Sequence, residues 1–126
     1  MIDVELDNRS GQEVDEAGAV ALARRVLAAE GIDAGELGIA FVDGEESRAL
    51  KAEHLGIDEA TDVLSFPIDG RGAVPEGVPR ALGDLVLCPQ VAGDDWRWPL
   101  VHGLLHLLGY EHGEAMEARE RALLEG

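Results

Sequence analysis

The sequence has little of several residue types. Its one cysteine, Cys88, excludes an internal disulfide framework and a thiolate-rich zinc site. Lysine and arginine total 10 against 26 aspartate and glutamate residues, which gives a formal net charge of −16. That balance excludes nucleic-acid binding through bulk positive potential. The longest nearly uncharged apolar stretch, Trp98 to Tyr110, is too short to span a bilayer, and the N-terminus has no secretory pattern. The sequence therefore predicts a cytoplasmic protein with no membrane partner.

What is present suffices for one folded domain. The chain has 126 residues, of which 46% are hydrophobic, so it can bury a core. No repeat, low-complexity tract or linker divides it. We therefore predict a single domain over residues 1–126.

The hydrophobic periodicity predicts both strands and helices. Strands are expected at residues 2–6, 37–42, 62–66 and 85–88. Helices are expected at about residues 14–30, 45–55, 100–108 and 114–124, and residues 69–79 form the one long loop. This order favours an α+β fold in which helices pack around a mixed β-sheet.

Three histidines lie close together near the end of the chain. His102 and His106 are four residues apart on an expected helix, so their imidazoles point the same way. Gly109 allows the left-handed residue that ends a helix, and His112 follows after a short loop. Three imidazoles that converge and leave one position open are typical of a catalytic zinc site, although nickel or iron stay open as alternatives.

The alternative is that these histidines are ordinary core residues. The helix is apolar on every side, so it must be buried, and each unpaired buried imidazole would cost about 1–3 kcal/mol. A metal ion removes that cost. Gly103 also favours a metal site over ordinary core histidines. Glycine inside a helix costs about 1 kcal/mol relative to alanine, so a bare backbone at this position needs a reason.

The histidine spacing matches the long zincin signature H-E-x-x-H-x-x-G-x-x-H with one change. Gly103 stands where the glutamate would act as the general base of a peptidase. The sequence therefore disfavours peptidase activity, and it names no general base.

Three motifs carry a resemblance to a known family: HGLLHLLGYEH at residues 102–112, TDVLSFP at residues 61–67 and LGDLVL at residues 82–87. In this order they closely resemble the YbeY family of bacterial metal-dependent endoribonucleases. The resemblance implies a mixed sheet with surrounding helices and a zincin-like, metal-bearing helix. It also implies one zinc ion per chain, held by His102, His106 and His112, which act in catalysis through the metal.

The resemblance further implies a substrate and partners. Single-stranded RNA is the expected substrate, and the expected role is 16S rRNA 3′-end maturation together with ribosome quality control. The small ribosomal subunit and an Era-type GTPase are the expected partners.

Some positions depart from the family pattern or have open roles. Glu111 replaces the usual aspartate and is a candidate for supporting a ligand imidazole. Asp84 is a second candidate, although it could instead cap a turn. Leu55 stands where many members have an arginine, and Arg48 or Lys51 are possible substitutes.

The segment 88–99 is shorter than in most members of the family, and Trp96 and Trp98 are expected to cover the gap. Leu55, the shortened segment and the acidity of the chain keep one alternative open, a catalytically weak or inactive metal-binding, ribosome-associated module. A hydrolase of another small substrate is a further alternative.

Overall fold

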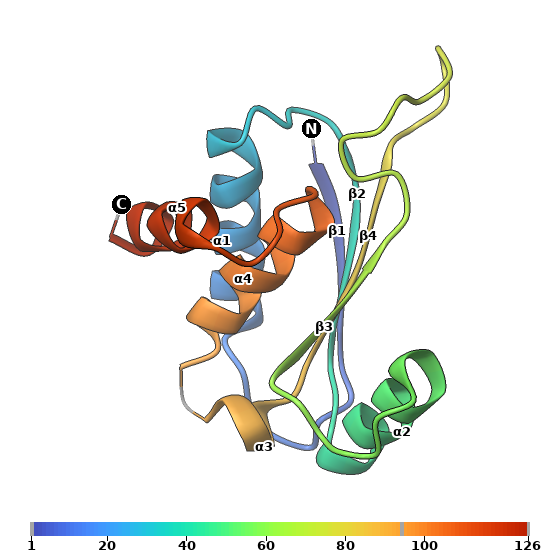
Figure 1. The fold of residues 1–126 in the computed structure, drawn as a ribbon, viewed down its shortest axis with the longest axis vertical. Helices are drawn as coiled ribbons and strands as arrows, with labels where there is room; N and C mark the ends of the chain where they lie inside the picture. Colours follow the sequence, from blue (N-terminus) through green and yellow to red (C-terminus); the bar gives the residue numbers. More distant parts are fainter. Residues whose placement is uncertain (1, 94, 126) are drawn as a thin grey trace.

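A mixed four-stranded sheet forms the centre of the fold, in the order β1-β2-β4-β3 (Figure 1). The computed structural model describes residues 2–93 and 95–125, so Met1, Asp94 and Gly126 of the predicted domain lie outside the described residues. The strands are β1 (Ile2–Asn8), β2 (Gly35–Phe41), β3 (Val63–Pro67) and β4 (Ala81–Leu87). The helices are α1 (Glu16–Ala29), α2 (Gly44–Leu55), α3 (Pro89–Ala92), α4 (Arg97–Leu107) and α5 (Glu114–Glu125).

The strand pairing confirms the expected mixed sheet. β1 pairs with β2 and β2 with β4 in parallel, whereas β3 pairs with β4 in antiparallel orientation. Helices α1, α4 and α5 lie on one side of the sheet, and α2 lies on the other (Figure 1). The α+β class predicted from the sequence is therefore confirmed.

All the expected strands and helices are present with ends that differ by a few residues, and two differences bear on the site. Strand β4 begins at Ala81 rather than at Leu85, because its first residues already pair with β2 and β3. The short helix α3 was not predicted, and it occupies the abbreviated segment before α4. None of the helices in the described part of the chain has the length and apolar character needed to cross a bilayer.

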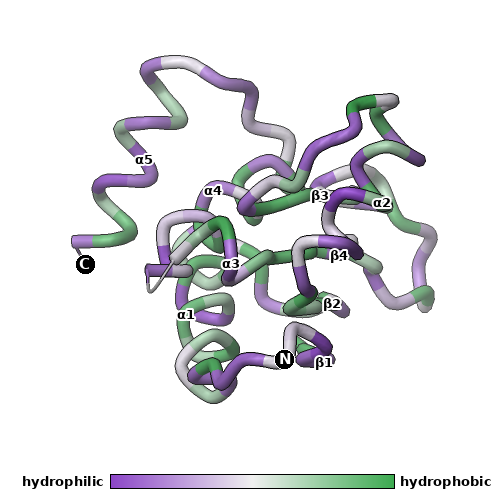
Figure 2. The backbone as a smooth tube through the Cα atoms, turned by 90° about the horizontal axis from the view of Figure 1, so that it is seen from below, coloured by the Kyte–Doolittle hydropathy of each residue, from purple (hydrophilic) through white to green (hydrophobic). Residues whose placement is uncertain are grey.

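The main core lies between the sheet and helices α1, α4 and α5. Leucines of α4 are fully buried there with Leu27 of α1 and Met116 of α5. In Figure 2, hydrophobic and hydrophilic residues alternate along α5, as expected for a helix that covers a core with one face only. Trp96 packs edge-on against the buried Phe41, with ring centroids 6.4 Å apart, so it covers the core beside the shortened segment as predicted. Trp98 instead stacks on His102, and 42% of its surface is exposed.

Gly103 lets α4 lie directly on strands β3 and β4. A Cβ atom there would lie 2.8 Å from Leu85 Cδ2, 2.9 Å from Val63 Cγ2 and 3.2 Å from Ser65 Oγ. The Ser65 hydroxyl also donates a hydrogen bond of 3.0 Å to the Gly103 carbonyl. Close packing is thus the reason for a glycine inside this helix.

We expect Gly103→Ala to destabilise the protein, although alanine is the better helix former. Overpacking costs about 1–3 kcal/mol, which exceeds the gain of about 1 kcal/mol in helix propensity. Urea denaturation of Gly103→Ala, Val63→Ala and the double variant measures this. The double variant should be more stable than the sum of the single effects predicts, since Val63→Ala removes the clash with Val63 Cγ2, although the one with Leu85 remains. Additive effects, or a more stable Gly103→Ala, would contradict the account.

Candidate metal centre

The three histidines of the predicted cluster come together at the end of α4. The ring centroids of His102 and His106 are 4.6 Å apart, and His112 lies 5.1 Å from His102 and 4.5 Å from His106. One possible ligand atom of each lies within 4.8 Å of the others. In residues 2–93 and 95–125, no other group of histidine, cysteine or carboxylate side chains has this geometry.

The local backbone explains how His112 reaches the other two. Helix α4 ends in a Schellman motif, in which the Gly109 amide donates to the His106 carbonyl and the Tyr110 amide to the Leu105 carbonyl, each at 3.0 Å. Gly109 has a φ of 96°, which side-chain-bearing residues rarely adopt. The chain reverses at this point, and His112 returns toward the two helical imidazoles.

Both helical imidazoles are oriented through their outer nitrogens. His102 Nδ1 lies 2.5 Å from the Glu120 carboxylate, and His106 Nδ1 lies 3.0 Å from the Tyr110 carbonyl. An Nδ1–H that donates to these acceptors leaves the Nε2 lone pair free. The two Nε2 atoms face each other at 3.2 Å. Two lone pairs at this distance repel unless a proton or a cation lies between them, so the donor set fits a metal ion.

The protonation state also suits ligation. Burial, and to a smaller extent the neighbouring His102, hold the pKa of His106 below its ordinary value of 6.5. The His106 imidazole is therefore neutral at pH 7, which is the form that binds a metal ion.

Glu120 was missed by the sequence analysis. Its side chain is 7% exposed on α5, between the buried Met116 and Leu123 at helical spacing. Its position on the apolar face of α5 could have predicted a buried, paired role, because charged residues are rarely buried without a partner.

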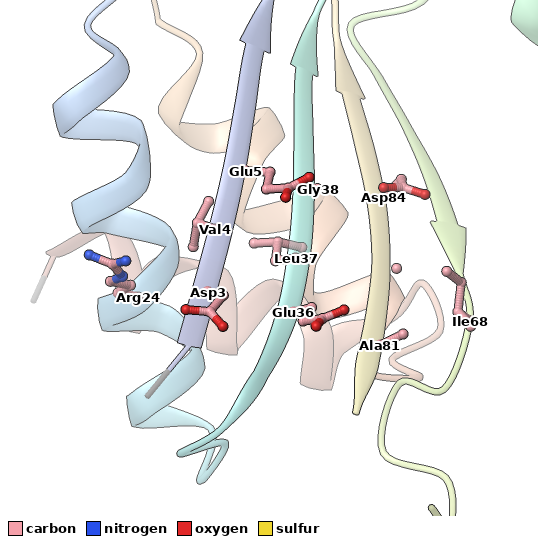
Figure 3. Close-up of a pocket in the computed structure, with 11 residues that line it drawn as sticks. Asp3, Val4, Glu5, Arg24, Glu36, Leu37, Gly38, Ile68, Ala81 and Asp84 are labelled. Atoms are coloured by element: carbon pink, nitrogen blue, oxygen red, sulfur yellow. The ribbon is translucent and has the colours of Figure 1, made fainter. Parts of the chain in front are cut away.

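Among the described residues, neither of the two predicted supporting residues hydrogen-bonds to a histidine of the cluster, whose Nδ1 partners are Glu120 and Tyr110. Asp84 is exposed on the opposite face of the sheet, beside Glu5 and Glu36, with the helices behind the sheet (Figure 3). The prediction that Asp84 orients an imidazole is therefore wrong. The prediction failed because β4 begins at Ala81, before Asp84. In this strand Gly83 and Leu85 face α4, so Asp84 points to the other side of the sheet. Glu111 is exposed in the turn between α4 and α5, and Glu120 instead supports His102.

The two substitutes suggested for the family arginine lie on the same helix as Leu55, away from the histidines. Arg48 and Lys51 belong to α2, across the sheet from α4 (Figure 1). Arg48 is paired with Asp58 at 2.5 Å and Lys51 with Glu59 at 3.0 Å. Both side chains are thus paired with nearby carboxylates on the α2 side of the sheet. Leu55, at the arginine's position, is exposed at the end of α2.

A second polar cluster supports the histidine turn from behind. The buried Glu30 carboxylate at the end of α1 accepts hydrogen bonds from the Tyr110 hydroxyl at 2.6 Å, from Arg71 at 2.9 Å and from Arg119. Burial alone would raise the pKa of Glu30, but the hydrogen bonds from Tyr110 and Arg119 outweigh it, and the pKa lies below its ordinary value of 4.5. Tyr110 thus links the two clusters: its hydroxyl donates to Glu30, and its backbone carbonyl accepts from His106 Nδ1.

Fold and site together define an α+β protein with a three-histidine centre of the kind that holds a metal ion. The family model described as Endoribonuclease YbeY matches residues 5–125. The chain therefore belongs to the YbeY family, and the resemblance seen in the sequence is confirmed.

Individual relatives support this assignment. The chain is 37% identical to the endoribonuclease YbeY of Salinispora tropica over 97% of its own length and 90% of that protein's. It is 43% identical to that of Halorhodospira halophila over 71% of this chain and 69% of the relative. The solution structure of TM1509 from Thermotoga maritima has the same fold, with a TM-score of 0.59 at 22% identity, covering 99% of this chain and 87% of that one.

We expect loss of the Glu120 carboxylate to weaken metal binding. Partners that orient a ligand histidine contribute about 10- to 100-fold to metal affinity. Glu120→Ala should raise the zinc dissociation constant by that factor, and Glu120→Gln by less, since its amide oxygen still accepts the Nδ1–H. Competition with a chromogenic chelator measures the constants, with Glu125→Ala, an exposed position on the same helix, as the control. Equal zinc affinity in Glu120→Ala and Glu125→Ala would show that Glu120 has no part in the site.

Proposed function

We propose that this chain is a zinc-dependent endoribonuclease that cleaves single-stranded RNA. The observation that carries the proposal is the facing pair of Nε2 atoms at 3.2 Å, each held by an outward hydrogen bond, in a chain of the YbeY family. His102, His106 and His112 are proposed to hold one zinc ion. Three protein ligands leave a fourth tetrahedral position for substrate or water, which is the pattern of catalytic rather than structural zinc.

The chain's own residues have defined tasks in this mechanism. Glu120 and the Tyr110 carbonyl hold the Nδ1 protons of the helical imidazoles, so that both Nε2 atoms point to the shared site. A cavity of about 290 Å³ beside His102 and His112 leaves room for the substrate. When bound, zinc supplies a Lewis acid for the negative charge that develops at the scissile phosphate. No side chain is assigned as the general base.

The proposed cellular role follows the family resemblance. It is 16S rRNA 3′-end maturation and ribosome quality control in the cytoplasm, with the small ribosomal subunit and an Era-type GTPase as partners. The net charge of −16 repels RNA phosphates, so we expect weak binding with a steep dependence on salt. The two positive charges of the metal and delivery of the substrate by the ribosome both offset this repulsion.

RNA cleavage by purified protein tests the proposal. Zinc-loaded protein should cut a labelled single-stranded RNA and leave the same RNA intact when it is annealed to its complement. A chelator should stop cleavage, and added zinc should restore it. Absence of cleavage with one zinc bound per chain would contradict the proposal and favour the non-catalytic, ribosome-associated module.

A further inference from the structure

An exposed indole lies directly beside the histidine centre. Trp98 precedes His102 by one helical turn on α4, and the two rings stack with centroids 4.8 Å apart and planes 24° from parallel. Of the large hydrophobic side chains exposed in the described part of the chain, Trp98 alone is aromatic. One face of the indole therefore covers a histidine, while 42% of the residue's surface remains open to solvent.

The indole also forms a wall of the cavity next to the histidines. This cavity of about 290 Å³ is lined by Trp98, Met116 and Gly113, by the imidazoles of His102 and His112, and by two glutamates, Glu117 and Glu120. The Glu120 carboxylate lies against His102 Nδ1. The cavity is at the small end of the range for ligand pockets, so it suits one planar ring system rather than several. A ring held there lies next to the proposed metal site.

We propose that Trp98 is a stacking site for one nucleobase of the RNA next to the cleaved phosphodiester. The inference rests on the proposed function, because it assumes an RNA substrate. Stacking on an aromatic face tolerates any base and requires no positive charge, which suits a chain of net charge −16. Single-stranded RNA exposes its base faces, whereas a duplex hides them, so the contact also favours single strands.

The two tryptophans of the chain allow a direct test by fluorescence. Trp96 packs against Phe41 away from the cavity, so Trp96→Phe leaves Trp98 as the sole indole. Titrating this variant, without metal, with a short single-stranded oligoadenylate should quench the Trp98 emission. The same titration with a duplex RNA should quench it much less. RNA binding measured by anisotropy with no change in Trp98 emission would overturn the proposal.

Substitutions at Trp98 separate stacking on RNA from packing on His102. Trp98→Leu keeps an apolar group against the imidazole but cannot stack on a base, whereas Trp98→Phe keeps an aromatic face. We expect Trp98→Leu to raise the RNA dissociation constant and KM about tenfold or more, with a smaller effect on kcat, and Trp98→Phe to recover most of the loss. Zinc content should stay the same in both. A fall in zinc affinity with unchanged RNA binding would mean that Trp98 only packs against the ligand.

These experiments distinguish failure of the inference from failure of the proposed function. RNA cleavage without Trp98 quenching, and with an unchanged KM in Trp98→Leu, would overturn the stacking site alone. Quenching by single-stranded RNA without cleavage would overturn nuclease activity and support the stacking site. Absence of any RNA binding would overturn both.

Discussion

Replacing His106 with alanine is expected to abolish metal binding and RNA cleavage together. The wild-type chain should bind about one zinc ion, because three converging imidazoles form one site. His106→Ala removes the ligand at the centre of the cluster and leaves two. The loss in zinc affinity should therefore exceed the roughly 100-fold that removing an orienting partner costs. Elemental analysis of the purified protein and single-stranded RNA cleavage measure the two effects.

His54 provides a matched control for this experiment. It is the one histidine of the chain outside the cluster. It is exposed on α2, on the other side of the sheet from α4, and its ring contacts Phe66. His54→Ala should keep its zinc and its activity. Full zinc content in His106→Ala, or equal losses in both variants, would refute the assignment of the site.

The second large effect is expected from Glu30. Glu30→Ala removes the acceptor of the Tyr110 hydroxyl and of two arginines, and we expect it to lower the free energy of unfolding by about 2–3 kcal/mol. The buried position of Glu30 is the reason for the size of this effect. Glu46→Ala is the control, because Glu46 also accepts two hydrogen bonds from an arginine, Arg9, but at the exposed surface. Its cost should stay below about 1 kcal/mol. Urea denaturation compares the two variants.

The effect of Glu30 should also depend on pH in a defined direction. The pKa of Glu30 is lower in the folded protein than its ordinary value of 4.5. The charged carboxylate therefore gives its full stabilisation of the folded protein at any pH above 4.5. This stabilisation disappears as the pH falls through the lower, folded-state pKa. The difference in unfolding free energy between the wild type and Glu30→Gln should therefore be constant near pH 7 and shrink below pH 4.5. A difference that grows toward acid pH would contradict the proposed role of Glu30.

The histidine site was predictable because its information is local. The spacing of His102 and His106 within one helix places both imidazoles on one face, and Gly109 signals the reversal that returns His112. Glu120 reaches the site from α5, a different helix. The residue spacing within one helix does not predict which other helix packs against it, so this contact could not be predicted. The Glu30 cluster is more remote still, since Arg119 is 89 residues away in sequence. Such contacts follow from the packing of α1 against α4 and α5, which a pattern of residues does not specify.

The wrong assignment of Asp84 has a similar cause. A strand predicted to start at Leu85 leaves Asp84 in a turn, where it could face either side. The strand begins at Ala81, and the alternation of side chains then places Asp84 on the face opposite the helices. A difference of a few residues in a strand boundary thus decided which face an acidic residue occupies. Helix propensity alone indicated that Gly103 needs a reason, and the sequence analysis counted it toward a metal ion. The structure gives a different reason, which is the close packing of α4 on β3 and β4.

X-ray absorption at the zinc edge of the loaded protein tests the central claim most directly. The account predicts three imidazole nitrogens and one further light atom at about 2.0–2.1 Å, with one imidazole fewer in His106→Ala. A first shell that contains sulfur, or fewer than three imidazoles in the wild type, would contradict a centre built from His102, His106 and His112.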